Sequence, residues 1–301
     1  MLGKWMDEKP LVRDLVKAHS RQFTPAERRV APFFQGESLE VALQSITKLA
    51  EAAEVSTPTI VRFARKLGFD GFHDMQNAIR AELADRIKKP LAKLEAAEMA
   101  GQQDHILNRF AQQAVSNINR TLSHLDLAAF DDVTEELADT SKAVYLLGGR
   151  ITRANAQNFF NHLQIIRPGV TLMDSSPNVW PQTLLDFTAD TVLVLFDIRR
   201  YEKDLERLAS LAVGQGARII LFTDQWGSPI EKQASASFRA MVEAPSAWDS
   251  SLALNLIVEA MIAQIQKRHA SRSTERIKTL EEMLGETPIF RDLGKTEDDV
   301  S

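Results

Sequence analysis

Between Ser45 and Phe69, apolar residues recur at helical spacing in two short runs. The runs consist of Ile46, Leu49, Ala50 and Ala53, then, after Val55 at a corner, Ile60, Phe63, Ala64 and Leu67. This pattern predicts two short helices joined by a tight turn, the layout of a helix-turn-helix. We expect Ser56 to cap the second helix, Pro58 to occupy its first turn and Gly68 to end it.

The second helix has a polar face opposite its apolar one, and this face contains no carboxylate. It is formed by Thr57, Pro58, Val61, Arg62, Arg65 and Lys66. A helix fits the major groove of DNA, where Arg62 and Arg65 can pair with guanine edges or with phosphates. Thr57 and Thr59 can form hydrogen bonds with base edges or with phosphates. The alternative is an ordinary amphipathic helix with a solvated basic side. DNA binding is favoured because four features occur together: the cap, the glycine stop, the short preceding helix and the face without carboxylates.

The rest of the first 88 residues reads as helical. Thr24, Pro25 and Glu27 form a capping box with proline at the first helical position. Further helices are expected over 11–18, 39–43 and 72–88, which gives an all-α domain of about five helices over 1–88. Residues 89–103 read as a linker, because Pro90 ends the preceding helix and Ala, Glu, Lys and Gln follow.

After the linker, Asp104 is expected to cap a longer helix with an apolar stripe. The stripe is Leu107, Phe110, Ala114, Ile118, Leu122 and Leu125. Such a stripe belongs to the core or covers a partner subunit.

From Lys142 onward, short β-rich runs alternate with helical patterns. Strands are expected over 143–147, 170–173, 191–196, 218–223 and 237–242. Helices are expected over 154–163, 180–185, 202–213, 229–234, 250–268 and 274–284. This alternation predicts an α/β domain over 104–285 with a five-stranded parallel sheet flanked by helices, followed by a tail over 286–301. Ligands of such sheets bind at the carboxyl ends of the strands.

The loops that follow the strands supply the candidate ligand-binding residues. Gly148 and Gly149 follow the first strand, where they form either a structural turn or an anion site at a helix N-terminus. Arg199 and Arg200 stand at the start of a helix, where like charge meets the positive end of the helix dipole. This arrangement is unfavourable unless an anion or a carboxylate compensates, which favours a ligand or a dimer contact there over a solvated turn. The candidates are Gly148, Gly149, Arg150, Thr152, Asp197, Arg199, Arg200, Tyr201, Thr223 and Glu243.

The amino-acid composition and the distribution of charge exclude some classes of function and favour others. The chain of 301 residues has no cysteine, which excludes disulfides and thiolate metal sites. Its six histidines lie apart, so we expect no metal and no cofactor. Residues 1–95 hold 16 Lys and Arg against 13 Asp and Glu, a net +3, whereas the remainder holds 20 against 28, a net −8. This distribution suits a DNA-contacting module joined to one that repels DNA. No apolar run is long enough to span a bilayer, and we expect a cytoplasmic protein.

The chain resembles a known protein family. The stretch from Ser45 to Leu83, preceded by TPAERRVAPFF, is similar to the N-terminal helix-turn-helix of the RpiR family of bacterial transcriptional regulators. Residues 122–265 look like the sugar isomerase (SIS) domain that follows it. The resemblance implies a homodimeric or tetrameric regulator whose SIS domain binds a phosphosugar or related metabolite. It places Ser56, Thr57, Thr59, Arg62 and Arg65 against DNA, and the 148–152 and 197–201 loops near phosphate.

The second loop reads DIRRY, whereas the family's usual loop is rich in serine and glycine. Guanidinium groups recognise carboxylate or phosphate, so we expect an anionic, sugar-derived ligand. The main hypothesis is therefore a regulator, with repressor as the default, that binds a palindromic operator in duplex DNA. Two alternatives remain open. The SIS domain could serve only as a dimerisation scaffold, or the protein could be an isomerase-like enzyme with Glu243 as its base.

Overall fold

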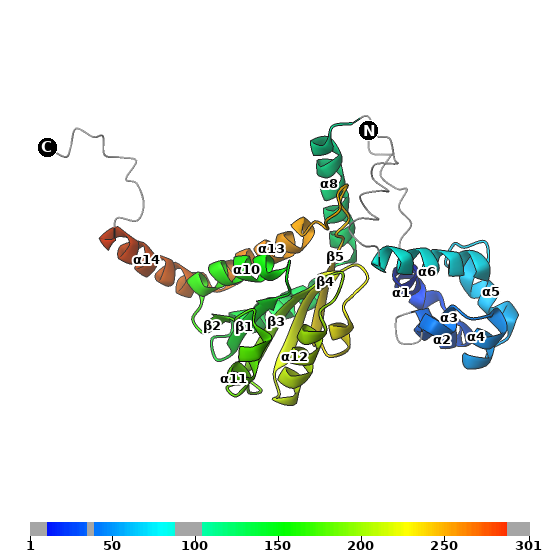
Figure 1. The fold of residues 1–301 in the computed structure, drawn as a ribbon, viewed down its shortest axis with the longest axis horizontal. Coiled ribbons are helices and arrows are strands. Elements are labelled where there is room, and N and C mark those ends of the chain that lie inside the picture. Colours follow the sequence, from blue (N-terminus) through cyan, green and yellow to red (C-terminus); the bar gives the residue numbers. More distant parts are fainter. Residues whose placement is uncertain (1–10, 35–38, 88–103, 288–301) are drawn as a thin grey trace. The chain divides into compact units, whose positions relative to one another are not determined.

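The computed structural model describes residues 11–34, 39–87 and 104–287. The chain divides into two compact units, Met1–Lys89 and Pro90–Ser301, which are described one at a time (Figure 1). The expected linker, 89–103, and most of the expected tail lie outside the described residues, so the domain boundaries stay predictions. Within the described residues, no helix has both the length and the apolar character that crossing a bilayer requires.

The first unit is helical, as expected. Its α-helices are α1 (Val12–His19), α2 (Pro25–Val30), α3 (Leu39–Ala42), α4 (Ile46–Ala52), α5 (Thr57–Lys66) and α6 (Phe72–Ile87), and a 3₁₀ turn, Ala31–Phe34, follows α2. Phe63 lies at the centre of the core, with its ring 5.0 Å from that of Phe23 and 5.6 Å from that of Phe34. Burial of the apolar face of α5 therefore fixes which side of this helix is left for solvent.

The helix-turn-helix forms over the predicted residues. The hydroxyl of Ser45 caps α4 by accepting a hydrogen bond from the amide of Lys48. Glu54 makes the turn with φ of 51°, and Gly68 ends α5 with φ of 91°. Ser56 occupies the N-cap position of α5, but its hydroxyl makes no cap bond to a helix amide. The expectation of a side-chain cap was wrong in this respect, because that hydroxyl bonds to the side chain of Thr59.

The second unit is built on a five-stranded parallel sheet with the strand order β2-β1-β3-β4-β5. The strands are β1 (Ala143–Gly148), β2 (Val170–Leu172), β3 (Thr191–Asp197), β4 (Arg218–Asp224) and β5 (Ala236–Ala240). The predicted fold class is confirmed, and each predicted strand is present within two residues of its expected ends. The β5 strand ends at Ala240 rather than at the expected Val242.

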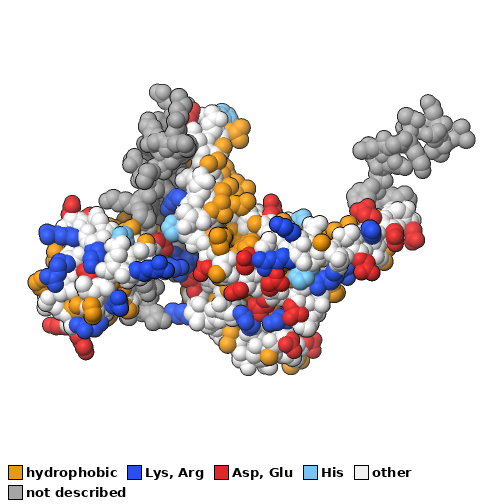
Figure 2. All heavy atoms as spheres, turned by 180° about the vertical axis from the view of Figure 1, so that it is seen from behind, with side chains coloured by type: hydrophobic (Ala, Val, Ile, Leu, Met, Phe, Trp, Pro, Cys, Tyr) orange, Lys and Arg blue, Asp and Glu red, His pale blue; other side chains and the backbone are white. Residues whose placement is uncertain are grey.

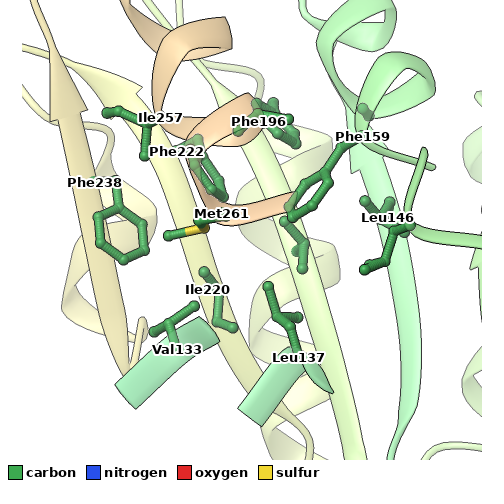
Figure 3. Close-up of a cluster of buried hydrophobic side chains, with 14 of the residues drawn as sticks. Val133, Leu137, Leu146, Phe159, Phe196, Ile220, Phe222, Phe238, Ile257 and Met261 are labelled. Carbon is green, nitrogen blue, oxygen red and sulfur yellow. The ribbon is translucent and has the colours of Figure 1, made fainter. Parts of the chain in front are cut away.

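Helices cover both faces of the sheet (Figure 1). They are α8 (Ile106–His124), α9 (Leu127–Ala138), α10 (Arg153–Ile166), α11 (Trp180–Leu184), α12 (Lys203–Gly214) and α13 (Leu252–Arg268). Helix α14 (Ala270–Glu286) packs against α10 and α13 and not on the sheet itself (Figure 1). On one face, Phe196, Phe222 and Phe238 pack with Phe159 from α10 and Met261 from α13 (Figure 3). On the other face, α11 and α12 pack against the sheet through a second apolar cluster that includes Trp180 and Leu208.

Three details differ from the sequence expectations. Helix α9 was not predicted, although Asp126 caps it by accepting hydrogen bonds from the amides of Ala128 and Ala129. The cap of α8 is His105 rather than Asp104, since the imidazole accepts from the amide of Leu107. The segment expected to be a helix over 229–234 is a 3₁₀ turn, Pro229–Lys232.

Helix α8 is attached to the sheet unit partly through polar contacts. The side chain of Asn117 donates to the carbonyl of Glu243, and the hydroxyl of Thr121 accepts from the amide of Met241. Apolar side chains are exposed along this helix (Figure 2), and Leu107, with 68% of its surface accessible, is among them. The apolar stripe expected on α8 is therefore only partly buried in the hydrophobic core.

Candidate nucleic-acid interface and ligand site

The solvent face of α5 carries the residues predicted to contact DNA. The helix buries Ile60, Phe63 and Ala64 in the domain core, and this leaves Arg62 and Arg65 exposed on the outside. Thr57 is half-buried at the start of the same helix. Since α5 itself contains no Asp or Glu, its exposed face presents only cationic, hydroxyl and apolar groups.

Thr59 has a different place from the one expected. Its side chain is 6% exposed, and its hydroxyl accepts a hydrogen bond of 3.2 Å from Nη2 of Arg62. The same hydroxyl lies 3.0 Å from the hydroxyl of Ser56. Thr59 therefore lies behind the exposed face and orients the guanidinium of Arg62.

Lys66 is tied to its own domain. Its ammonium group donates to the carbonyl of Gln22 at 3.1 Å and forms a salt bridge with the buried carboxylate of Glu27. Burial alone raises the pKa of Glu27, but hydrogen bonds from Lys66 and Thr24 outweigh burial and lower it. Sequence reasoning placed Lys66 on an acid-free face. In the structure, its charge is balanced by a carboxylate from α2.

A cleft of about 530 Å³ adjoins the N-terminal end of α5. Its lining includes Glu51, Glu54, Arg29, Thr47 and Thr57, and Arg29 donates to the carbonyl of Glu54. Acidic side chains therefore flank one side of the basic helix face. Their negative charge opposes the approach of a phosphate group from that side.

In the second unit, the structure brings together two of the predicted ligand loops. Strands β1 and β3 are neighbours, and their connections leave in opposite directions along the sheet, so this is a topological switch point. The amide of Gly149 donates to the carbonyl of Phe196 at 3.1 Å, and the hydroxyl of Thr152 donates to the same carbonyl at 2.6 Å. A Cβ on Gly148 would lie 2.3 Å from the carbonyl oxygen of Thr152, so glycine is required there.

A carboxylate that the sequence did not single out lies against the first of these loops. Oε1 of Glu202 accepts a hydrogen bond of 2.6 Å from the backbone amide of Arg150. A Cβ on Gly149 would lie 2.6 Å from this same oxygen, so the glycine allows the carboxylate to approach the backbone. Glu202 is the N-cap residue of α12, and its 52-residue separation from Arg150 left no sequence pattern to link the two.

Asp197 ends β3 and is almost fully buried. Its carboxylate accepts a hydrogen bond from the hydroxyl of Ser228 and one from the amide of Glu202. Burial raises the pKa of Asp197 to about 7, with repulsion from Asp224 and Glu202 adding to the increase and the two hydrogen bonds opposing it. Asp197 thus holds the start of α12 against the 3₁₀ turn that follows β4.

Arg199 is compensated by carboxylates of this chain. Its amide donates to Asp224, its guanidinium donates to Asp249 at 2.9 Å, and the same group lies 4.1 Å from the ring centre of Trp226. The hydroxyl of Tyr201 also donates to Asp224. Burial raises the pKa of Asp224, although these hydrogen bonds act against that effect. Arg199 and Tyr201 therefore contact carboxylates of this chain.

Arg200 is exposed, with φ of 69°. The last two predicted ligand residues make contacts within the protein. The hydroxyl of Thr223 donates to the carbonyl of Asp197, and the carboxylate of Glu243 accepts from the side chain of Gln225.

These features define a class of protein: a helix-turn-helix domain whose second helix has a basic exposed face, combined with an α/β domain built on a five-stranded parallel sheet. Two family models match the chain accordingly. The helix-turn-helix domain of the rpiR family matches residues 11–86, and the SIS domain matches residues 137–264. The chain belongs to the RpiR family of transcriptional regulators and contains a SIS domain.

Two curated relatives are similar over much of their length. An uncharacterized HTH-type transcriptional regulator of Haemophilus influenzae is 24% identical over 215 residues, covering 71% of this chain and 74% of that protein. The HTH-type transcriptional regulator HexR of Escherichia coli K12 is 22% identical over 291 residues, covering 94% of this chain and 98% of HexR.

Two solved structures share the fold. The sugar isomerase domain of an RpiR transcription factor from Sphaerobacter thermophilus has a TM-score of 0.56 at 18% identity, covering 60% of this chain and 99% of that one. The Vibrio vulnificus NanR protein, solved in complex with ManNAc-6P, has a TM-score of 0.53 at 17% identity, covering 90% of this chain and 97% of NanR.

Proposed function

We propose that this regulator binds a palindromic operator through α5 and that its SIS domain senses an anionic, sugar-derived metabolite. The observation that carries the DNA-binding part is the face of α5, where Arg62 and Arg65 are exposed on a helix whose opposite side is fully buried. The diameter of a helix matches the major groove, and arginine pairs bidentately with guanine there. We propose that Ser56, which is exposed, and Thr57, which is half-buried, contact the DNA backbone from the N-terminal end of α5.

A palindromic operator requires two copies of α5 related by two-fold symmetry. We therefore propose a homodimer as the smallest active form, with a tetramer as a larger alternative. The exposed apolar side chains of α8 support self-association, because Leu107, Val115 and Leu122 all leave apolar surface exposed on one helix.

The proposed ligand is a phosphosugar or a related anion. Arg150, Arg153 and Arg200 are exposed in the loops at the carboxyl ends of β1 and β3 and at the start of α10. Within the described part of the chain, none of the three forms a salt bridge. Guanidinium groups in this position favour an anion. NanR, which shares the fold, was solved with a phosphosugar, and this supports the same ligand class here.

A specific observation also favours a second candidate, in which the SIS domain is a dimerisation scaffold that binds no ligand. Internal carboxylates already engage the predicted loops, since Glu202 bonds to the first loop and Asp224 bonds to the second. The enzyme alternative has weaker support, because Glu243 is engaged by Gln225 and the two relatives described above are named transcriptional regulators.

Selection of duplex DNA from a random pool by the full chain tests the main proposal. We expect enrichment of a palindrome whose half-sites lie about one helical turn apart. A panel of phosphosugars and sugar acids should then contain a compound that changes the affinity for this palindrome. Failure to enrich any sequence would reject the DNA-binding proposal. An enriched palindrome that no metabolite affects would favour the scaffold. A reporter gene placed downstream of the palindrome tests the proposed repressor role, which requires expression to rise when this regulator is deleted.

A further inference from the structure

The contact between Glu202 and the β1 loop puts a negative charge at a backbone position suited to an anion. The amide of Arg150 points at Oε1 of Glu202 over 2.6 Å, and the absence of a side chain on Gly149 makes room for that oxygen. This loop opens α10, whose N-terminal end favours negative charge through the helix dipole. The carboxylate of Glu202 therefore accepts, from within the same chain, the hydrogen bond of the Arg150 amide that an anionic ligand would accept.

The surroundings of Glu202 make this contact unusual. Its neighbour Asp197 has a pKa that is raised mainly by burial, and repulsion from Asp224 and from Glu202 adds to that increase. Glu202 thus occupies the loop despite local like-charge repulsion. Arg150, Arg153 and Arg200 are exposed residues of the same two loops and of the start of α10, close in the chain to one partner or the other of this contact, and we call them the cationic rim.

We propose that Glu202 is an autoinhibitory competitor for the ligand site: its carboxylate holds the Gly149–Arg150 backbone in the free protein, and the anionic group of a ligand must displace it. The inference rests on the proposed function in that it concerns the same ligand loop. It assigns to Glu202 the control of anion affinity. A phosphate or carboxylate ligand would take the amide of Arg150 and the cationic rim, while the Glu202 side chain moves toward solvent.

Displacement has a consequence for α12. The amide of Glu202 donates to Asp197, and this bond involves the backbone, so it persists when the side chain leaves the loop. The movement is therefore a side-chain rotation at the start of α12 and requires no unfolding of the helix. Such a local exchange lowers the apparent affinity of a ligand by the fraction of time that the loop is free of Glu202.

Thermal unfolding of the full chain in increasing inorganic phosphate tests the inference, with chloride at matched ionic strength as the reference. The variants are Glu202→Ala, which removes the competitor, and Glu202→Gln, which keeps its shape but removes its charge. Asp204→Ala is the matched control, because it removes the same charge from an exposed position in the first turn of α12. We expect the phosphate concentration for half-maximal stabilisation to fall at least tenfold in Glu202→Ala, to fall less in Glu202→Gln, and to remain that of the wild type in Asp204→Ala.

Equal phosphate responses in the wild type, Glu202→Ala and Glu202→Gln would overturn the inference, and so would an equal gain in Asp204→Ala. Should Glu202→Ala fail to fold, the Glu202→Gln result decides, since its side chain has the same volume. Operator binding by the same samples separates the two hypotheses. Specific DNA binding together with unchanged phosphate affinity rejects only the competitor role, whereas loss of sequence preference in the wild type rejects the proposed function.

Discussion

Nη2 of Arg62 donates a hydrogen bond to Oγ1 of Thr59, one turn earlier on α5, over 3.2 Å. The threonine is buried and the arginine is exposed, so the bond links the domain core to the group that we propose reads DNA. A long side chain loses conformational freedom when it binds. An existing bond that holds the guanidinium reduces this loss.

Thr59→Val is therefore expected to weaken operator binding although Thr59 does not reach the solvent face. Valine keeps the branched shape but removes the acceptor for Arg62. We expect the affinity to fall by roughly 0.5–1.5 kcal/mol, the usual net contribution of one hydrogen bond. Fluorescence anisotropy with the selected operator measures the change. Thr279→Val, on exposed helix α14, serves as the matched control. Unchanged affinity in a folded Thr59→Val protein would contradict the positioning role.

The stability of the SIS unit should depend on pH through Asp197. Its folded pKa of about 7 lies above its ordinary value of 3.8, so the folded state binds a proton that the unfolded chain releases. The stabilisation is complete below about pH 4 and is lost as pH rises through 7. For this group the loss is at most about 1.4 kcal/mol per pH unit.

Urea unfolding at pH 5, 6, 7 and 8 measures this dependence. In the wild type, we expect the free energy of unfolding to decline across this range. Asp197→Asn should flatten the decline, because asparagine does not titrate. A parallel decline in both proteins would assign the pH dependence to another group, with Asp224 as the first candidate because its pKa is also raised.

Arg167 should be required for the stability of the sheet unit. Its guanidinium is fully buried and donates to the carbonyls of Leu137, Lys142 and Pro168, which joins the end of α9 to the edge of the sheet. Burial, with repulsion from Arg272, lowers the pKa of Arg167 to about 10, so it stays charged at neutral pH.

Arg167→Met should cost about 3 kcal/mol or more of unfolding free energy, because buried carbonyls lose their donors. Chemical denaturation measures this loss of unfolding free energy. Arg207→Met, at an exposed position on α12, is the control. A loss below about 1 kcal/mol would show that water or other donors replace the guanidinium.

Much of the fold could be read from local patterns. The apolar spacing of α4 and α5 and the capping box at Thr24 depend on residues three or four apart, and the structure confirms both. Strand β3 was equally clear, because the buried residues from Val192 to Phe196 are continuously apolar. Helix α9 was missed because its burial pattern is short and it follows directly after α8, although Asp126 offered a cap signal.

The site could be predicted only in part, since its key contacts join residues far apart in the chain. The sequence located the loops containing Arg150 and Arg199. It could not show that Glu202 and Asp224 would reach the backbone amides of those two residues. Similarly, the α5 pattern placed Lys66 on the basic face, but only the folded domain brings Glu27 to its ammonium group. Local periodicity specifies which face a residue occupies, and tertiary packing decides which charges remain available.

The most direct test of this account is the ratio of the affinities of the full chain for its selected operator and for random duplex DNA, measured at one salt concentration. We predict a clear preference for the operator in the wild type. Arg62→Ala should lower operator affinity by about 1–3 kcal/mol and affect random DNA much less. Arg80→Ala, which removes an exposed cation from α6, should leave the ratio unchanged. A wild-type ratio of one, or an Arg62→Ala ratio equal to that of the wild type, would contradict the claim that α5 reads DNA.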